Sequence, residues 1–254
     1  MLLSRIIPCL LLQQNGLVKT TKFKNPKYIG DPINAVKIFN EKKVDELILL
    51  DIDSTQKNRE PNYKLIKSIA EESRMPLSYG GGIKNADQAK KIFSLGLEKI
   101  IINSEFFNNY KIVDDIANLS GSQSISVCVD IKKNIFSKYN IYIDRGKKKV
   151  NMSLNNFFDI INNLQIGEIV INSIDNDGVM NGYDLNLFNT FRTQTSLPIT
   201  MLGGAGHIDD LKKLIKASGG VVGAAAGSLF VFKGKYRAVL INYPNEKEKE
   251  YIHS

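Results

Sequence analysis

The residues of this chain that are best suited to chemistry stand directly after short apolar runs. Asp51, Asp130 and Asp175 each follow such a run, and Asp177 comes two positions later. A carboxylate placed in this way can donate or accept a proton, and two of them facing one substrate form a general acid–base pair. Taken singly, an aspartate after a strand more often caps the next helix. Both interpretations stay open for each of the four.

Paired glycines and small polar residues form a second group. Gly81-Gly82 precedes Asn103-Ser104, and Gly203-Gly204 precedes Gly227-Ser228 in the same order. Glycine lets backbone amides approach an anion, and a following helix N-terminus adds partial positive charge. Glycines at strand ends also simply make turns. Because the pattern occurs twice, we predict two phosphate sites for a small molecule with a phosphate at each end, with Lys19 as a further countercharge.

The elements that must position these residues alternate between short apolar runs and amphipathic stretches. The predicted strands are 5–12, 46–51, 76–79, 99–102, 123–130, 168–172, 198–202 and 220–225. The predicted helices include one starting at Asp31-Pro32, one from about Pro61, and 86–95, 153–164 and 208–217. Residues 16–21 are expected to be a polar loop and 135–150 an inserted hairpin. Eight strand–helix units predict a parallel sheet closed into a single (β/α)8 TIM barrel, whose active site lies where the strands end.

The whole chain, 1–254, is predicted to be one domain, because no linker interrupts it. Asp51 and Asp175, and Gly81 and Gly203, are separated by nearly the same number of residues. This spacing predicts two similar half-barrels, about 1–120 and 121–254.

Composition excludes several function classes. The net charge is +8, but the lysines are spread over nearly every predicted helix, which favours a solvated surface over a nucleic-acid interface. Cys9 and Cys128 lie in apolar runs and are expected to be buried and reduced. His207 and His253 are the only histidines and no Cys/His spacing suits a metal, so no metal site is expected. No cofactor is expected either. Without a signal peptide or an apolar run of membrane length, the protein is expected to be cytoplasmic, with no membrane partner.

The sequence resembles the HisF family, the cyclase subunits of imidazole glycerol phosphate synthase, over nearly its whole length. The matching stretches are 5–10, 30–32, 45–52, 80–83, 173–178, 182–184 and 203–206. The resemblance implies a glutaminase partner that releases ammonia at the bottom of the barrel, and it adds Asp177 and Gly178 to the ligand-binding residues. It also implies an ammonia gate made of Arg5, Glu46, Lys99 and Glu168. Charges at strand starts also occur as a plain solvent-facing rim.

The departure from the family lies at the other end of the barrel. The cyclase uses two aspartates as acid and base; the second is kept as Asp130, but Leu11 stands in place of the first. Asp51 and Asp175 lack the family's geometry for replacing it, and Val179 replaces a usual threonine. Losing one member of such a pair forfeits roughly 10²–10⁴-fold in rate.

The runs 8–12 and 16–20 resemble a branch of the family that works with a glutaminase and a sugar amidotransferase to make acetamidino groups on surface-polysaccharide sugars. We therefore predict an ammonia-supplying subunit of that kind. One alternative is a genuine cyclase of histidine biosynthesis. Another is a non-enzymatic protein that docks on a glutaminase and activates it.

Overall fold

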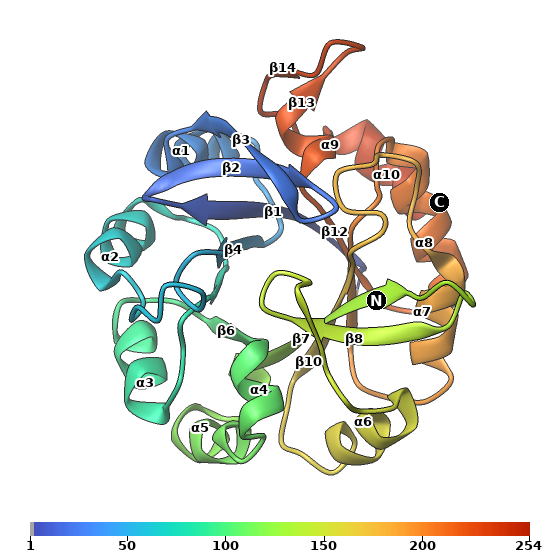
Figure 1. Ribbon diagram of the computed structural model, residues 1–254. Coiled ribbons are helices and arrows are strands. Elements are labelled where there is room, and N and C mark those ends of the chain that lie inside the picture. Colours follow the sequence, from blue (N-terminus) through green and yellow to red (C-terminus); the bar gives the residue numbers. More distant parts are fainter. Residues whose placement is uncertain (1–2) are drawn as a thin grey trace.

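The computed structural model describes residues 3–254 as a closed barrel of eight parallel strands with helices around it (Figure 1). The pairing runs in sequence order around the ring, and β10 also pairs with β7, which closes it. The barrel strands are β1 (Arg5–Gln13), β4 (Leu47–Asp51), β5 (Leu77–Gly80), β6 (Lys99–Ile102), β7 (Ile125–Lys133), β10 (Glu168–Ser173), β11 (Ile199–Leu202) and β12 (Gly223–Ala226). The predicted TIM barrel is therefore confirmed.

Helices follow the strands and cover the outside of the ring. They are α1 (Pro32–Glu41), α2 (Tyr63–Glu72), α3 (Ala86–Ser94), α5 (Ile112–Ser120), α6 (Leu154–Ile161), α7 (Leu185–Arg192), α8 (Ile208–Ser218) and α10 (Glu246–His253). The first begins where the sequence predicts, because the Asp31 carboxylate accepts a hydrogen bond from the Asn34 backbone at 2.9 Å and Pro32 fits the first turn. Two short helices, α4 (Ser104–Asn108) and α9 (Ser228–Val231), directly follow β6 and β12.

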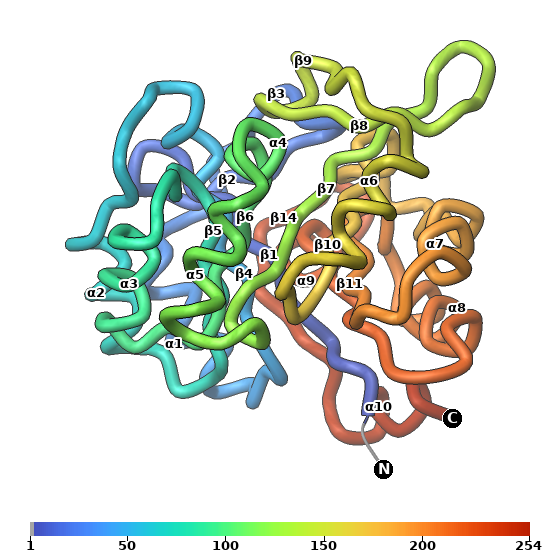
Figure 2. The backbone as a smooth tube through the Cα atoms, turned by 90° about the horizontal axis from the view of Figure 1, so that it is seen from below, coloured from blue at the N-terminus to red at the C-terminus, as the bar shows by residue number. Residues whose placement is uncertain are grey.

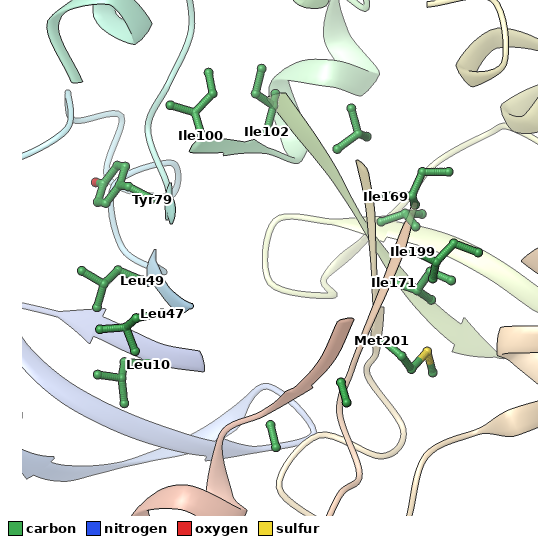
Figure 3. Close-up of a cluster of buried hydrophobic side chains, with 14 of the residues drawn as sticks. Leu10, Leu47, Leu49, Tyr79, Ile100, Ile102, Ile169, Ile171, Ile199 and Met201 are labelled. Atoms are coloured by element: carbon green, nitrogen blue, oxygen red, sulfur yellow. The ribbon is translucent and has the colours of Figure 1, made fainter. Parts of the chain in front are cut away.

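Alternation along the strands divides the core into two parts. One set of side chains points outward and packs under the helices, as Figure 3 shows. The labelled members are Leu10, Leu47, Leu49, Tyr79, Ile100, Ile102, Ile169, Ile171, Ile199 and Met201. The other set faces the barrel interior: Ile7, Cys9, Ile48, Ile101, Cys128, Val170, Leu202 and Ala225. Since successive strand residues face opposite sides, both sets follow from period-two alternation in buried strands.

Two antiparallel hairpins extend from the end of the barrel where the strands finish. The first joins β2 (Gly16–Thr21) to β3 (Lys24–Gly30), and the second joins β8 (Tyr139–Ile143) to β9 (Lys148–Lys149). The prediction of a polar loop over 16–21 is wrong, because Leu17 and Val18 are buried and β2 pairs with β1. Figure 2 shows β3, β8 and β9 at one end of the molecule and α10 at the other.

Smaller elements complete the chain. A turn of 3-10 helix, η1 (Ser122–Ser124), precedes β7, and a small separate sheet pairs β13 (Phe232–Lys233) with β14 (Ala238–Val239). Strand β12 begins three residues later than predicted, since Gly219 ends α8 in a left-handed conformation. Within residues 3–254, none of the helices has both the length and the apolar character that crossing a membrane requires.

Candidate functional site

Four charged side chains form a closed ring at the end of the barrel where the strands begin. Arg5 donates to the carboxylates of both Glu46 and Glu168, with Nη2 2.6 Å from Glu168 Oε1. Lys99 Nζ lies 2.9 Å from Glu168 Oε2 and 3.6 Å from Glu46 Oε1. Each charge therefore contacts two of the opposite sign. The structure brings together all four residues of the predicted gate.

Hydroxyl groups satisfy the remaining acceptors of this ring. Ser78 Oγ donates to Glu46 Oε1 at 2.9 Å, and Thr200 donates to Glu168. Burial by itself would raise the pKa of Glu168, but Arg5 and Lys99 outweigh it and hold that pKa below its usual range. A buried carboxylate so well paired stays ionised, so the ring carries two positive and two negative charges.

Above the ring, the interior becomes apolar. Ile7, Ile48, Ile101 and Val170 belong to the interior cluster and are at most 3% exposed. Cys9 and Cys128 are buried in the same cluster as free thiols, as predicted. Burial raises the pKa of both thiols, so they remain protonated.

The strands end in a cavity of about 390 Å³ that collects most of the predicted mouth residues. Those that line it are Leu11, Lys19, Asp51, Gly81, Gly82, Asn103, Ser104, Asp130, Asp177, Gly178, Gly203, Gly204, Gly227 and Ser228. Asp175 does not line it. A concave site with convergent polar groups is the usual setting for a small ligand.

Asp130 is the most perturbed carboxylate in the cavity. It is 7% exposed, and its two oxygens accept hydrogen bonds from Asn172 at 3.0 Å and Asn103 at 3.1 Å. Burial raises the pKa of Asp130 to about 7, against the effect of these two amides. Near neutral pH the group can both hold and release a proton, as a general acid or base must.

This raised pKa predicts a pH-dependent stability. The folded pKa of about 7 exceeds the ordinary value of 3.8, so the folded state binds more protons than the unfolded chain between these pH values. Stability must then fall as pH rises through that window, by on the order of 4 kcal/mol in total and roughly 3 kcal/mol between pH 5 and pH 8. We expect urea unfolding followed by circular dichroism at pH 5 and pH 8 to show this loss in the parent and much less of it in Asp130→Asn. Exposed Asp159→Asn is the control, and equal pH dependence in parent and Asp130→Asn would contradict the raised pKa.

The apolar side chain of Leu11 lines the cavity at the barrel mouth. It lies on β1, pairs with Val18 and Leu50 on the neighbouring strands, and packs against the interior cluster. The other carboxylates that line the cavity include Asp51 and Asp177, and both are engaged elsewhere. On β1, the cavity is lined by Cys9 and Leu11, and neither side chain is a carboxylate.

Asp51 and Asp175 accept hydrogen bonds from backbone amides. Asp51 accepts from the amides of Asp53 and Ser54 at 2.9 and 3.0 Å, so it caps the turn that follows β4. Asp175 accepts from the Lys133 amide at 2.8 Å and ties β10 to the extended end of β7.

Asp177 fastens the first hairpin over the mouth. Its carboxylate accepts from Thr20 Oγ1 at 2.7 Å and from the Phe23 amide at 3.0 Å. A Cβ on the neighbouring Gly178 would lie 2.1 Å from the Thr20 carbonyl oxygen, so glycine allows β2 to approach. These two residues therefore position Lys19, which β2 carries.

Lys19 is buried beside the second glycine–serine pair. Its ammonium donates to the Cys9 carbonyl, and a Cβ on Gly227 would lie 2.0 Å from Lys19 Nζ. Burial lowers the pKa of Lys19, although Cys9 and Asp177 act in the opposite direction. The structure thus places the predicted countercharge against Gly227-Ser228.

Both glycine pairs adopt conformations that other residues avoid. The φ angles are +127° and +73° at Gly81 and Gly82, and +97° and +113° at Gly203 and Gly204. Added Cβ atoms would also meet backbone, at 2.4 Å for Gly81 and 2.1 Å for Gly204. The glycines are therefore required by the turns themselves, whatever ligand they hold.

Sequence reasoning missed a group on the rim of the cavity. Buried Asp53 accepts from Gln13 Nε2 at 3.1 Å and Lys57 Nζ at 2.6 Å, and Arg145 approaches it from the second hairpin. Gln56 lines the cavity beside Arg145. Asp53, Gln56 and Lys57 are neighbours in the sequence, but Gln13 and Arg145 stand far from them and no motif joins the three segments, so only the folded structure reveals the group. Among residues 3–254, no three His, Cys, Asp or Glu side chains cluster as metal ligands would.

Comparison with known proteins places the chain in a family. The family model described as "Histidine biosynthesis protein" matches residues 5–237. A Vibrio vulnificus relative named "Putative imidazole glycerol phosphate synthase subunit hisF3" is 55% identical over 251 residues, 98% of this chain and 96% of its own. A Leptospira interrogans relative named "Putative imidazole glycerol phosphate synthase subunit HisF" is 52% identical over 253 residues, 99% of each chain.

A Streptococcus mutans protein named "Imidazole glycerol phosphate synthase subunit HisF" is more distant. It is 33% identical over 230 residues, 91% of each chain. The barrel, its charged ring and these whole-length similarities lead to one conclusion: the chain belongs to the histidine biosynthesis protein family, as a HisF-like member.

Proposed function

We propose that this HisF-like chain is an ammonia-channelling subunit that has lost ring-closing activity. It receives NH₃ from a HisH-like glutaminase at the charged ring and passes it through the barrel to the mouth. The observation that carries the proposal is Leu11, which lines the cavity where Asp130 has the most strongly raised pKa and where Asp177, also raised, is bonded to Thr20 and Phe23. A hydrocarbon side chain transfers no proton, so the acid–base pair that ring closure needs is incomplete.

The interior supports passage of a small neutral molecule. The ring of Arg5, Glu46, Lys99 and Glu168 is electrically balanced, and the layer above it is apolar. An ion crossing that layer would lose its hydration, whereas NH₃ carries no net charge. Asn103 and Asn172 then hold Asp130 at the far side.

We propose that the recipient of this ammonia is a sugar amidotransferase, which converts an acetamido group to an acetamidino group and itself supplies the activating chemistry. The runs at 8–12 and 16–20 support this assignment through the branch they resemble. The identity of 55% to the Vibrio relative, against 33% to the Streptococcus synthase subunit HisF, is in line with a separate branch. The two predicted phosphate sites remain available to a phosphorylated ligand in the mouth.

A genuine cyclase of histidine biosynthesis is the second candidate, favoured by Asp130 and by whole-length similarity to named synthase subunits. Complementation of a histidine auxotroph separates the two. The ammonia-channelling proposal requires that the parent chain, expressed with its glutaminase, fails to restore growth, and that deleting its gene removes acetamidino sugars from the cell surface. Growth at the rate given by an authentic cyclase would refute it.

Blocking the bore distinguishes a channel from a protein that merely docks on a glutaminase. Val170 faces the interior one step above Glu168, so Val170→Phe places a ring in the path. We expect transfer of nitrogen from glutamine to the acceptor to fall sharply, while transfer from added ammonium salt at the mouth is unchanged. Overpacking should also cost about 1–3 kcal/mol of stability.

The control for this variant is Ile171→Phe, on the same strand but packed under the helices. It carries a similar overpacking cost and leaves the interior open. Equal rates of nitrogen transfer from glutamine in Val170→Phe and Ile171→Phe would refute the channel. They would favour the alternative of a protein that only docks on a glutaminase and activates it.

A further inference from the structure

The turn between β8 and β9 lies over the centre of the barrel mouth, as the yellow-green loop in Figure 1 shows. Asp144 and Arg145 both adopt left-handed backbone, with φ of +54° and +56°. Non-glycine residues rarely hold this conformation, and such residues gather at ligand sites. Gly146 follows against Phe23 and Ile174, so the turn is packed in place. The fold thus delivers one arginine to the rim of the cavity at some conformational cost.

The Arg145 guanidinium is enclosed but poorly satisfied. Its side chain is 20% exposed, and Nη1 lies 3.9 Å from Asp53 Oδ1 and 3.5 Å from Gln56 Oε1. Asp53 Oδ1 already accepts from Gln13 at 3.1 Å and Oδ2 pairs with Lys57 at 2.6 Å, so Arg145 shares this carboxylate with two other donors. A guanidinium has five N–H donors in a planar fork, and a single long hydrogen bond leaves most of them free for a ligand.

Gln56 supplies an unmatched donor at the same place. Its Nε2 is buried and has no hydrogen-bond partner among residues 3–254, and Gln56 and Arg145 line the same cavity. Buried amide groups are paired in the large majority of cases, so an unpaired one calls for an explanation such as a missing ligand. Gln56 and Arg145 reach this place from different loops and are joined by the long hydrogen bond from Arg145 Nη1 to Gln56 Oε1, which leaves Gln56 Nε2 without an acceptor among residues 3–254.

We propose that Arg145 and Gln56 form an oxyanion-binding subsite, which holds a phosphate or carboxylate group of a ligand in the mouth. The guanidinium fork matches the paired oxygens of either group, and the amide N–H adds a third donor. The subsite is separate from the glycine pairs, which offer backbone. It does not depend on ammonia passage, so either idea can fail alone.

Side-chain NMR of the whole ¹⁵N-labelled chain tests the subsite directly. We expect titration with inorganic phosphate, and separately with acetate, to shift the Arg145 Nε–H and Gln56 Nε2–H signals saturably in at least one series. Saturation by phosphate alone identifies a phosphate site, and saturation by acetate identifies a carboxylate site. The absence of a saturable shift in both series would overturn the proposal.

Matched variants separate this subsite from other anion contacts. Arg145→Lys keeps the charge but loses the fork, so the Gln56 signal should saturate at about tenfold higher concentration. Lys148→Met, exposed on the same hairpin, should leave the midpoint unchanged. If Arg145→Lys fails to fold, Gln56→Leu read through the Arg145 signal replaces it, with the same weakening expected. An unchanged midpoint in the folded variant would refute the assignment.

Discussion

Leu11→Asp is expected to raise the rate of imidazole ring closure by about 10²–10⁴-fold, measured with the histidine-pathway ribonucleotide and a glutaminase or ammonium salt. The substitution puts a carboxylate into the cavity that Asp130 lines. Asp130, with its pKa of about 7, already suits one half of the proton transfer. The rate gain should carry over to growth of a histidine auxotroph.

The control is Leu11→Asn, because asparagine is similar to aspartate in size and polarity but has no titratable proton. It should leave ring closure at the level of the parent. An equal gain in both variants would show that polarity, and not proton transfer, limits the reaction. A parent chain that already turned over at the rate of the Asp variant would contradict the loss of activity inferred from Leu11.

Glu168→Gln is expected to have the largest effect on stability, about 3 kcal/mol in urea unfolding. Glu168 is 4% exposed and pairs with Arg5 at 2.6 Å and Lys99 at 2.9 Å. The variant keeps the shape but leaves two cations facing Glu46 alone. Because the folded pKa of Glu168 is lowered, its contribution is present above its ordinary pKa of 4.5 and is lost as pH falls through the folded value.

Glu71→Gln provides a matched control on the surface. Glu71 pairs with Lys67 at 3.7 Å, but both side chains are more than 60% exposed. Exposed pairs contribute about 0–1 kcal/mol, so this variant should unfold almost as the parent does. Similar losses in the two variants would mean that the buried ring adds nothing beyond an ordinary surface pair. The difference between Glu168→Gln and parent should also shrink at acid pH.

The barrel could be predicted because its determinants are local. Buried parallel strands appear as apolar runs, and Asp31-Pro32 signals a helix start through capping chemistry that needs only neighbouring residues. The hairpin formed by β2 was missed, because its polar residues Lys19, Thr20 and Thr21 suggest a loop. Burial of Lys19 and Thr20 comes from Asp177 and Gly227, which are distant in the chain. The two similar half-barrels stay a prediction.

The site was predictable only where a motif or a strand end marks it. The four ring charges stand where strands begin, and the structure groups them there as expected. Asp130 stands where a strand finishes, and it lies in the cavity at that end of the barrel. The sequence could not show that the carboxylates of Asp51 and Asp175 accept hydrogen bonds from backbone amides. Nor could it show Arg145, whose place over the mouth depends on a left-handed turn in an inserted hairpin.

On the proposed route for ammonia, the apolar layer between the ring and Asp130 would also select nitrogen by its protonation state. An ammonium ion would lose its hydration among Ile7, Ile48 and Val170, which costs several kcal/mol, so the proton would stay at the end where we propose that the glutaminase docks. On the proposed route, the neutral molecule that emerges meets Asp130, whose carboxyl can hand a proton back near pH 7. Reprotonation there would make the journey one-way, because the cation could not re-enter the layer it had just crossed.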